Sequence, residues 1–186
     1  MVKKSRTVNI VVLGEEGRSA ITTRYWNNRF IEKYDPTIED CAQKRVVVDD
    51  YTYSVAVTDT SGTEQFKGML ELFMRNGNIF IIVYSITSRR SFDNIQQVYE
   101  QITNGITKNS ICVLLGNKCD LEKQRQVSIQ EGEELALLMN CLFSEVSAKT
   151  GENVKEIFEN AIRAFHNVNP EVIEETIYKG KTCIIQ

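Results

Sequence analysis

The sequence predicts an α/β fold: a three-layer sandwich in which helices cover both faces of a six-stranded, mostly parallel sheet with one antiparallel edge strand. Short apolar runs rich in β-branched residues alternate along the chain with stretches of helical spacing. Several of these runs are continuously apolar rather than alternating, which is typical of strands buried on both faces of a parallel sheet.

Six apolar runs are expected to form the strands. They cover residues 7–13, 44–48, 53–59, 79–85, 111–117 and 142–145. A short turn at Asp49 and Asp50 separates the second run from the third, which predicts an antiparallel hairpin at one edge of the sheet. Right-handed crossovers are expected to join the other strands.

Helices are predicted in the gaps between these runs. Residues 92–106 place apolar side chains at helical spacing. Ser128 and Glu131 have the spacing of a capping box, which predicts a helix ending near residue 139. Asn153 and Glu156 are expected to cap a helix that ends near residue 167.

The composition is typical of one soluble domain. The chain has 186 residues, of which 42% are hydrophobic and 25% charged, and its net charge is −3. No nucleic-acid partner is expected, because such binding needs a clustered basic face. The five cysteines are odd in number and form no CxxC motif, so neither a disulfide framework nor a zinc site is expected. The single histidine, His166, is expected to be a surface residue.

The chain is expected to form one globular domain over residues 1–167, followed by a mobile tail over residues 168–186, because the periodic pattern ends after Pro170. No signal peptide is expected, since MVKKSR leads directly into a strand-like run. No apolar run approaches the roughly 20 residues that a membrane-spanning helix needs.

The segment GEEGRSA, residues 14–20, follows the first predicted strand and looks like a shortened phosphate-binding loop. The usual form is Gly, any four residues, Gly, Lys and then Ser or Thr. Here only Glu15 and Glu16 separate Gly14 from Gly17, and the residues that follow are Arg18, Ser19 and Ala20. Backbone amides at the start of the helix that comes next favour a phosphate.

The segment NKCD, residues 117–120, follows the fifth predicted strand and indicates guanine recognition. The carboxylate of Asp120 can accept the N1 and N2 hydrogens of guanine, a pair that adenine does not offer. Asn117 can join neighbouring loops, and the aliphatic stem of Lys118 can cover the purine. DTSG lies upstream at residues 59–62 and SAK downstream at residues 147–149, each after a predicted strand. All of these segments are therefore expected at the carboxyl edge of the sheet, where ligands bind.

In their order and spacing these motifs resemble those of the Ras superfamily of small GTPases, closest to the Ras and Rap branch. The resemblance covers about residues 6–167 and implies the P-loop NTPase fold of a small G domain. It implies an effector loop at YDPTIED, and guanine pockets at NKCDL and SAK, with effectors, exchange factors and GTPase-activating proteins as partners. The effector loop comprises Tyr34, Asp35, Pro36, Thr37, Ile38, Glu39 and Asp40.

The resemblance also implies roles for single residues toward GTP or GDP and Mg²⁺. Ser19 and Thr37 would ligate Mg²⁺, and Asp59 would hold it through water. Gly62 would donate its amide to the γ-phosphate, Phe30 would lie against the guanine, and Ala148 would donate its amide to the base oxygen. Loss of the γ-phosphate would release Thr37 and Gly62, which is the family's switch. The residues expected to contact nucleotide are therefore Gly14, Glu15, Glu16, Gly17, Arg18, Ser19, Ala20, Phe30, Thr37, Asp59, Gly62, Asn117, Lys118, Asp120, Ser147, Ala148 and Lys149.

Departures from the family pattern fall where phosphate chemistry takes place. A loop shorter by two residues offers fewer amides to the β-phosphate. Arg18 replaces a compact ammonium with a wider planar fork. Glu15 and Glu16 bring negative charge toward a triphosphate, unless they point to solvent. Thr63, which with Gly62 forms the expected catalytic pair, stands where most Ras relatives have a water-orienting glutamine. Reduced affinity and slow hydrolysis of GTP are therefore expected.

The last four residues, CIIQ, have the form of a prenylation box, in which Cys183 would carry a farnesyl group. One lipid binds membranes only marginally, and the tail adds little positive charge. The resemblance therefore implies reversible attachment to the cytoplasmic face of membranes, with a cytosolic pool. Two other readings stay open: a pseudo-GTPase scaffold fixed in one state, and, more distantly, an ATP-using P-loop enzyme.

Overall fold

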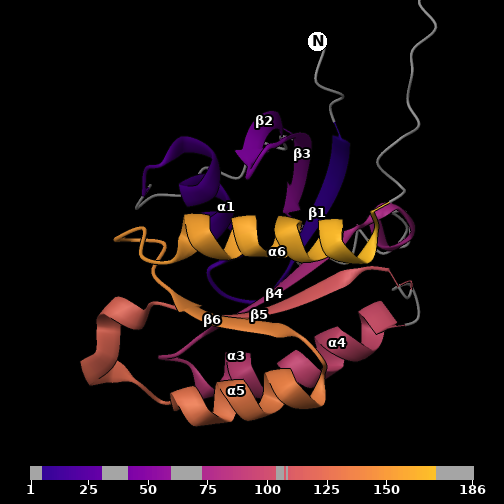
Figure 1. Ribbon diagram of the computed structural model, residues 1–186. Coiled ribbons are helices and arrows are strands. Elements are labelled where there is room, and N and C mark those ends of the chain that lie inside the picture. The colour runs from indigo at the N-terminus through magenta and orange to yellow at the C-terminus, as the bar shows by residue number, and fades with distance from the viewer. Residues whose placement is uncertain (1–5, 31–41, 60–72, 104–106, 108, 171–186) are drawn as a thin grey trace, which may run out of the picture.

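The computed structural model describes residues 6–30, 42–59, 73–103, 107 and 109–170. Its centre is a six-stranded sheet in the order β2-β3-β1-β4-β5-β6 (Figure 1). The strands are β1 (Arg6–Gly14), β2 (Ala42–Val48), β3 (Tyr51–Asp59), β4 (Ile79–Ser85), β5 (Ile111–Asn117) and β6 (Leu142–Val146). Each predicted strand is present, and the bounds differ from the predicted ones by two residues at most.

Only the β2–β3 pair is antiparallel, and β2 lies at the edge of the sheet, as the hairpin pattern predicted. All other neighbouring strands run parallel. The tight turn between β2 and β3 places Asp49 at a φ of 52°, a left-handed conformation that aspartate tolerates. β4 is buried along its whole length, which explains its uninterrupted apolar sequence.

The helices form the two outer layers. Those in the described residues are α1 (Arg18–Asn27), α3 (Arg89–Asp93), α4 (Ile95–Thr103), α5 (Ile129–Leu138) and α6 (Val154–Val168), together with a short 3-10 helix, η2 (Cys119–Gln124). In Figure 1, α1 and α6 lie on one side of the sheet, and α3, α4 and α5 lie on the other. The predicted three-layer architecture is therefore present.

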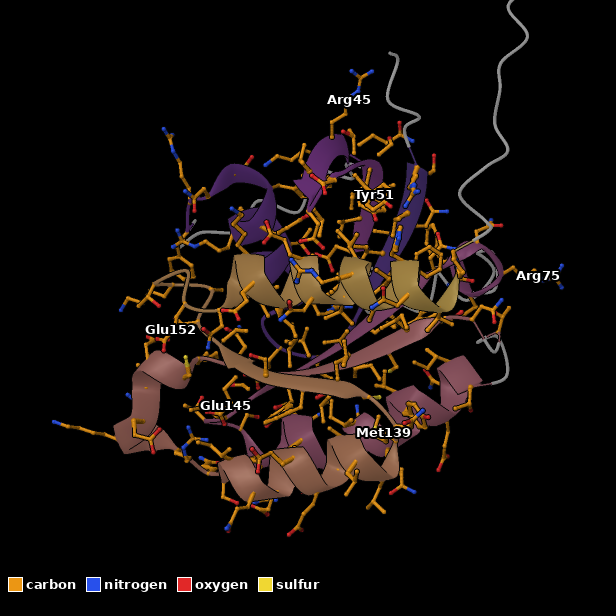
Figure 2. The ribbon with its side chains drawn as sticks, viewed as in Figure 1. Arg45, Tyr51, Arg75, Met139, Glu145 and Glu152 are labelled. Atoms are coloured by element: carbon orange, nitrogen blue, oxygen red, sulfur yellow. The ribbon has the colours of Figure 1, made fainter. Side chains whose placement is uncertain are left out.

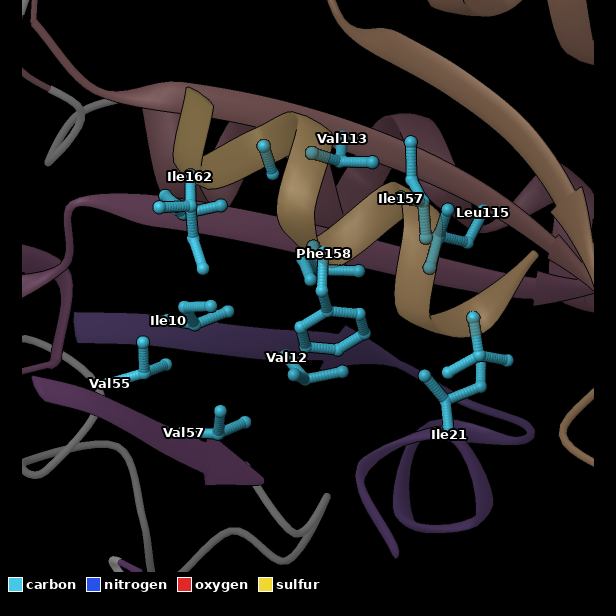
Figure 3. Close-up of a cluster of buried hydrophobic side chains, with 14 of the residues drawn as sticks. Ile10, Val12, Ile21, Val55, Val57, Val113, Leu115, Ile157, Phe158 and Ile162 are labelled. Carbon is cyan, nitrogen blue, oxygen red and sulfur yellow. The ribbon is translucent and has the colours of Figure 1, made fainter. Parts of the chain in front are cut away.

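Alternate residues of the strands supply the two cores. Ile10 and Val12 of β1 face α1 and α6, whereas Val11 and Leu13 face the opposite layer. Phe158 of α6 is fully buried and points toward β1 near Val12 (Figure 3). This packing fixes α1 beside the end of β1, so that the loop between them lies at the carboxyl edge of the sheet.

Two helix predictions were partly wrong: the single helix over residues 92–106 and the side-chain cap of α6 by Asn153. The helix predicted over residues 92–106 is interrupted in its described part: α3 starts earlier, capped by the Ser88 side chain, and Asn94 separates it from α4. Residues 104–106 lie outside the described residues. The Asn94 side chain donates to Glu15 on another element instead of facing its own helix. α5 begins with the predicted capping box between Ser128 and Glu131.

Asn153, which was expected to cap α6 through its side chain, does not do so. It has a left-handed backbone with φ at 56°, and its Nδ2 donates to the carbonyl of Glu145 at 2.9 Å. His166 is half-buried rather than fully on the surface, since its Nδ1 lies 2.9 Å from the Tyr53 hydroxyl and its ring lies beside Tyr51. Burial and the charge of Arg6 lower the pKa of His166.

Candidate guanine-nucleotide site

The loop of residues 14–17 leaves β1 and enters α1 through two glycines in left-handed conformations. Gly14 has a φ of 122°, and a Cβ there would lie 2.1 Å from the carbonyl oxygen of Val83. Gly17 has a φ of 88°, and a Cβ there would lie 2.2 Å from Nδ2 of Asn117. Both positions therefore require glycine, because neighbouring elements approach the backbone closely. The loop is held against β4 on one side and against the end of β5 on the other.

The two glutamates of this loop each contact a donor on another element. Nδ2 of Asn94 donates to Oε1 of Glu15 at 2.7 Å, and the guanidinium of Arg90 is 3.9 Å from its other oxygen. Nζ of Lys118 donates to Oε2 of Glu16 at 3.0 Å. The two carboxylate side chains are 39% and 44% exposed. The sequence left open whether these side chains point to solvent or toward phosphate. Glu15 is exposed and Glu16 half-buried, and each contacts a donor on another element.

The pKa of Glu16 reflects this environment. Burial raises the pKa, but hydrogen bonds from Lys118 and Ser88 and the charges of Lys118 and Arg90 outweigh burial, so the net shift is downward. The carboxylate therefore remains ionised at neutral pH and keeps its hold on the Lys118 ammonium.

Asn117, which is almost fully buried, connects three loops. Its Oδ1 accepts from the backbone amides of Lys118 at 2.8 Å and Ala148 at 3.1 Å. Its Nδ2 is the atom that closely approaches Gly17. One side chain at the end of β5 thereby holds the loop before α1, the NKCD segment and the loop after β6 together.

Asp120 and Ser147 are joined by a hydrogen bond across the same region. The Ser147 hydroxyl donates to Oδ1 of Asp120 at 2.6 Å and itself accepts from the amide of Thr150 at 3.0 Å. Ser147 is fully buried, so it fixes the orientation of the half-exposed carboxylate. Lys118 has a φ of 70°, which turns the chain sharply between Asn117 and Asp120.

Sequence reasoning missed Arg24 of α1. Its Nε donates to the carbonyl of Ala148 at 2.6 Å, and its other nitrogens reach the carbonyls of Lys149 and Asn28. Arg24 therefore holds the loop after β6 against α1. No motif or periodicity marks this arginine, because the two carbonyls that it holds in the loop after β6 are 124 and 125 residues away.

Ser19 at the start of α1 and Asp59 at the end of β3 lie together. The Ser19 hydroxyl donates to Oδ2 of Asp59, and Arg18 Nε lies 4.0 Å from Oδ1. Oδ1 is buried and accepts no hydrogen bond from the described residues. A hydroxyl and a carboxylate with an unsatisfied oxygen are the hard donors that Mg²⁺ prefers, so these residues fit a Mg²⁺ site that a nucleotide would complete. Within the described residues, no group of three or more His, Cys, Asp or Glu side chains could hold a metal by itself.

Three further predicted site residues are described, and the others lie outside the described residues. Phe30 lies beyond the end of α1 and is 38% exposed, and Lys149 is also exposed. Ala20 packs against the core beneath α1. The effector loop from Tyr34 to Asp40, with Thr37, and the pair Gly62 and Thr63 lie outside the described residues, as does Cys183.

The arrangement defines a small G domain of the P-loop NTPase fold, because the segments ending β1, β3, β5 and β6 converge at one edge of a mostly parallel sheet. A model of the Ras family matches residues 9–167. The chain therefore belongs to the Ras family of small GTPases, whose members bind guanine nucleotides, generally use Mg²⁺, hydrolyse GTP and act as switches with regulators and effectors.

Proposed function

We propose that this chain is a Ras/Rap-like GTP/GDP switch with weakened phosphate binding and slow hydrolysis of GTP. The observation that carries this proposal is that hydrogen bonds connect the residues expected to contact guanine. Asn117 holds three loops together and Ser147 orients Asp120. The carboxylate then accepts N1–H and N2–H of guanine, and adenine, which lacks that pair of donors, is rejected.

The phosphate side supports reduced affinity. Only two residues separate Gly14 from Gly17, so few amides surround a β-phosphate. Glu16 engages the ammonium of Lys118, and both loop glutamates place negative charge beside the start of α1. A bound triphosphate meets that charge, which lowers its affinity without affecting the choice of base.

Slow hydrolysis follows from the residues around the γ-phosphate. Thr63 replaces the glutamine that orients the attacking water in most Ras relatives, and its shorter side chain lacks that reach. Gly62 supplies an amide to the γ-phosphate in this proposal. Ser19 and Thr37 would hold Mg²⁺ with help from Asp59, and the bound cation would neutralise phosphate charge.

Partner binding is proposed for the effector loop and the adjoining strand β2. β2 is an edge strand whose Gln43, Lys44 and Arg45 are exposed, and Figure 2 shows Arg45 projecting from that edge. An effector can add a strand beside β2, because the edge offers unpaired backbone groups. Exchange factors and GTPase-activating proteins complete the set of expected partners.

Membrane association is proposed through a farnesyl group on Cys183. The described residues include no helix that is apolar and long enough to cross a bilayer, so a lipid on this cysteine is the anchor in this proposal. A single chain gives reversible attachment to cytoplasmic membrane faces and leaves a cytosolic pool. The G domain is assigned to residues 1–167 and the tail to residues 168–186.

A pseudo-GTPase scaffold is the second candidate, favoured by the Glu16–Lys118 ion pair, which occupies a lysine that nucleotide would otherwise engage. The two functions are separated by denaturing the purified protein and identifying the released nucleotide by chromatography. The switch predicts bound GDP, and a defective hydrolase predicts GTP. A protein that is folded and carries neither would contradict the switch and support the scaffold.

A further inference from the structure

Asp59 at the end of β3 is approached by two partners from α1. The Ser19 hydroxyl donates to one carboxylate oxygen, and Nε of Arg18 lies 4.0 Å from the other. The side chains of Arg18 and Asp59 are only 14% and 20% exposed. The arginine that replaces the usual loop lysine therefore lies within ion-pair distance of the carboxylate expected to help hold Mg²⁺.

The chemistry of arginine explains why this placement differs from that of lysine. Guanidinium is always charged, planar and weakly hydrated, so it pairs readily with carboxylates at low exposure. An ammonium is a compact, strongly hydrated point charge on a flexible stem, which can turn toward phosphate instead. Arg18 is the first residue of α1, so its charge also lies beside the helix end that favours phosphate.

A cation beside Asp59 has two electrostatic consequences. It offsets the negative charge of the carboxylate, and it repels a second cation that approaches the same carboxylate. Because both side chains have low exposure, solvent screens these interactions only weakly. It also keeps positive charge near an anionic ligand when Mg²⁺ is absent.

We infer that Arg18 is a positioning residue: its guanidinium supplies part of the positive charge that Mg²⁺ normally provides beside the bound nucleotide. Nucleotide retention by this chain then depends little on Mg²⁺. This inference rests on the proposed binding of guanine nucleotide.

The test measures dissociation of fluorescently labelled GDP from the full chain, chased with excess GDP, in millimolar Mg²⁺ and in EDTA. We expect EDTA to accelerate release of GDP less than about threefold in the natural protein. In Arg18→Lys we expect an acceleration of about tenfold or more, because the Asp59 carboxylate of this variant is open to the metal. Arg18→Gln, which removes the charge while keeping a planar polar group, is a second variant with the same expectation. Arg163→Lys is the matched control, since Arg163 pairs with Asp49 on an unrelated part of the molecule.

The outcomes separate this inference from the proposed function. Equal acceleration by EDTA in the natural protein and both Arg18 variants would overturn the role of Arg18 while leaving GDP binding intact. An increase in Arg163→Lys equal to that in Arg18→Lys would also overturn it. A folded natural protein that binds no labelled GDP would overturn the proposed function, and this inference with it.

Discussion

Glu16 and Lys118 form an ion pair across 102 positions of sequence, with Oε2 of the glutamate 3.0 Å from Nζ of the lysine. This contact joins the loop before α1 to the NKCD segment, so the phosphate side and the guanine side of the site share one charge pair. A nucleotide that engages Lys118 must compete with Glu16. The negative charge of the loop glutamates therefore acts on both the phosphate side and the guanine side of the site.

Replacing Glu16 by Gln should increase affinity for GDP and GTP by about twofold to fivefold, because a half-exposed pair of this kind contributes up to about 1 kcal/mol. The change releases Lys118 and removes one negative charge from the loop. Isothermal titration with each nucleotide measures the effect. Glu134→Gln on α5 is the control for loss of a surface carboxylate. Weaker binding in Glu16→Gln would show that the pair supports the bound state, and unchanged binding would show that Glu16 does not compete with nucleotide for Lys118.

Exchanging GEEGRSA for GSGGVGKSA should strengthen the hold on phosphate. It restores two residues and a lysine, and removes both glutamates. We expect affinity for GTP and GDP to rise more than about tenfold, or about 1.4 kcal/mol, with the preference for guanine over adenine unchanged. Intrinsic hydrolysis should stay slow because Thr63 remains, while stimulation by a Rap-type activating protein should appear only in the exchanged loop.

Dissociation rates and single-turnover hydrolysis, measured in both forms of the loop, test this expectation. Equal dissociation rates would mean that the natural short loop closes around phosphate by other contacts.

The Glu131 carboxylate of α5 makes a pH-dependent contribution to stability. Hydrogen bonds from the Ser128 backbone and hydroxyl and from Arg89 lower its pKa to about 2. A depressed folded-state pKa means that the stabilisation is complete above the unfolded value near 4.5, and is lost as the pH falls toward 2. Glu131→Gln should therefore lower the melting temperature at pH 7. The difference in melting temperature from the natural protein should become smaller as the pH falls from 4.5 to 2.5. A difference that is the same at every pH would refute this.

Replacing Cys183 by Ser should move the protein from membranes to the cytosol, because the lipid is the proposed anchor. Cell fractionation with immunodetection measures the distribution, and Cys141→Ser controls for loss of a thiol outside the proposed nucleotide site. An undiminished membrane fraction in Cys183→Ser would show that attachment does not depend on this residue.

The sheet could be predicted from sequence because continuous apolar runs mark buried parallel strands, and the 79–85 and 111–117 runs match β4 and β5 residue for residue. Helix ends were harder. Asn153 has a residue type that favours capping, yet it uses its amide on Glu145, a tertiary contact that local sequence does not encode.

The site was predictable where it consists of short motifs after strands, and less so where it depends on distant pairs. NKCD and SAK indicated that these two segments belong together, and the structure joins them by the hydrogen bond of Ser147 to Asp120 and that of the Ala148 amide to Asn117. The hydrogen bonds that join Glu15 to Asn94, Glu16 to Lys118 and Arg24 to Lys149 span 79 to 125 residues, and no spacing rule relates these pairs. The expected roles of Thr37, Gly62, Thr63 and Cys183 stay predictions.

The central claim, that Asp120 reads guanine in a site that binds GDP, is tested most directly by titrating GDP, ADP and xanthosine diphosphate into the natural protein and Asp120→Asn. We expect the natural protein to bind GDP at least about a hundredfold more tightly than ADP, because ADP lacks the pair of donors that the Asp120 carboxylate accepts. Asp120→Asn should lose GDP affinity and prefer xanthosine diphosphate, whose added carbonyl accepts from the new amide. Equal GDP affinity in both proteins, or equal affinity of the natural protein for GDP and ADP, would contradict the account.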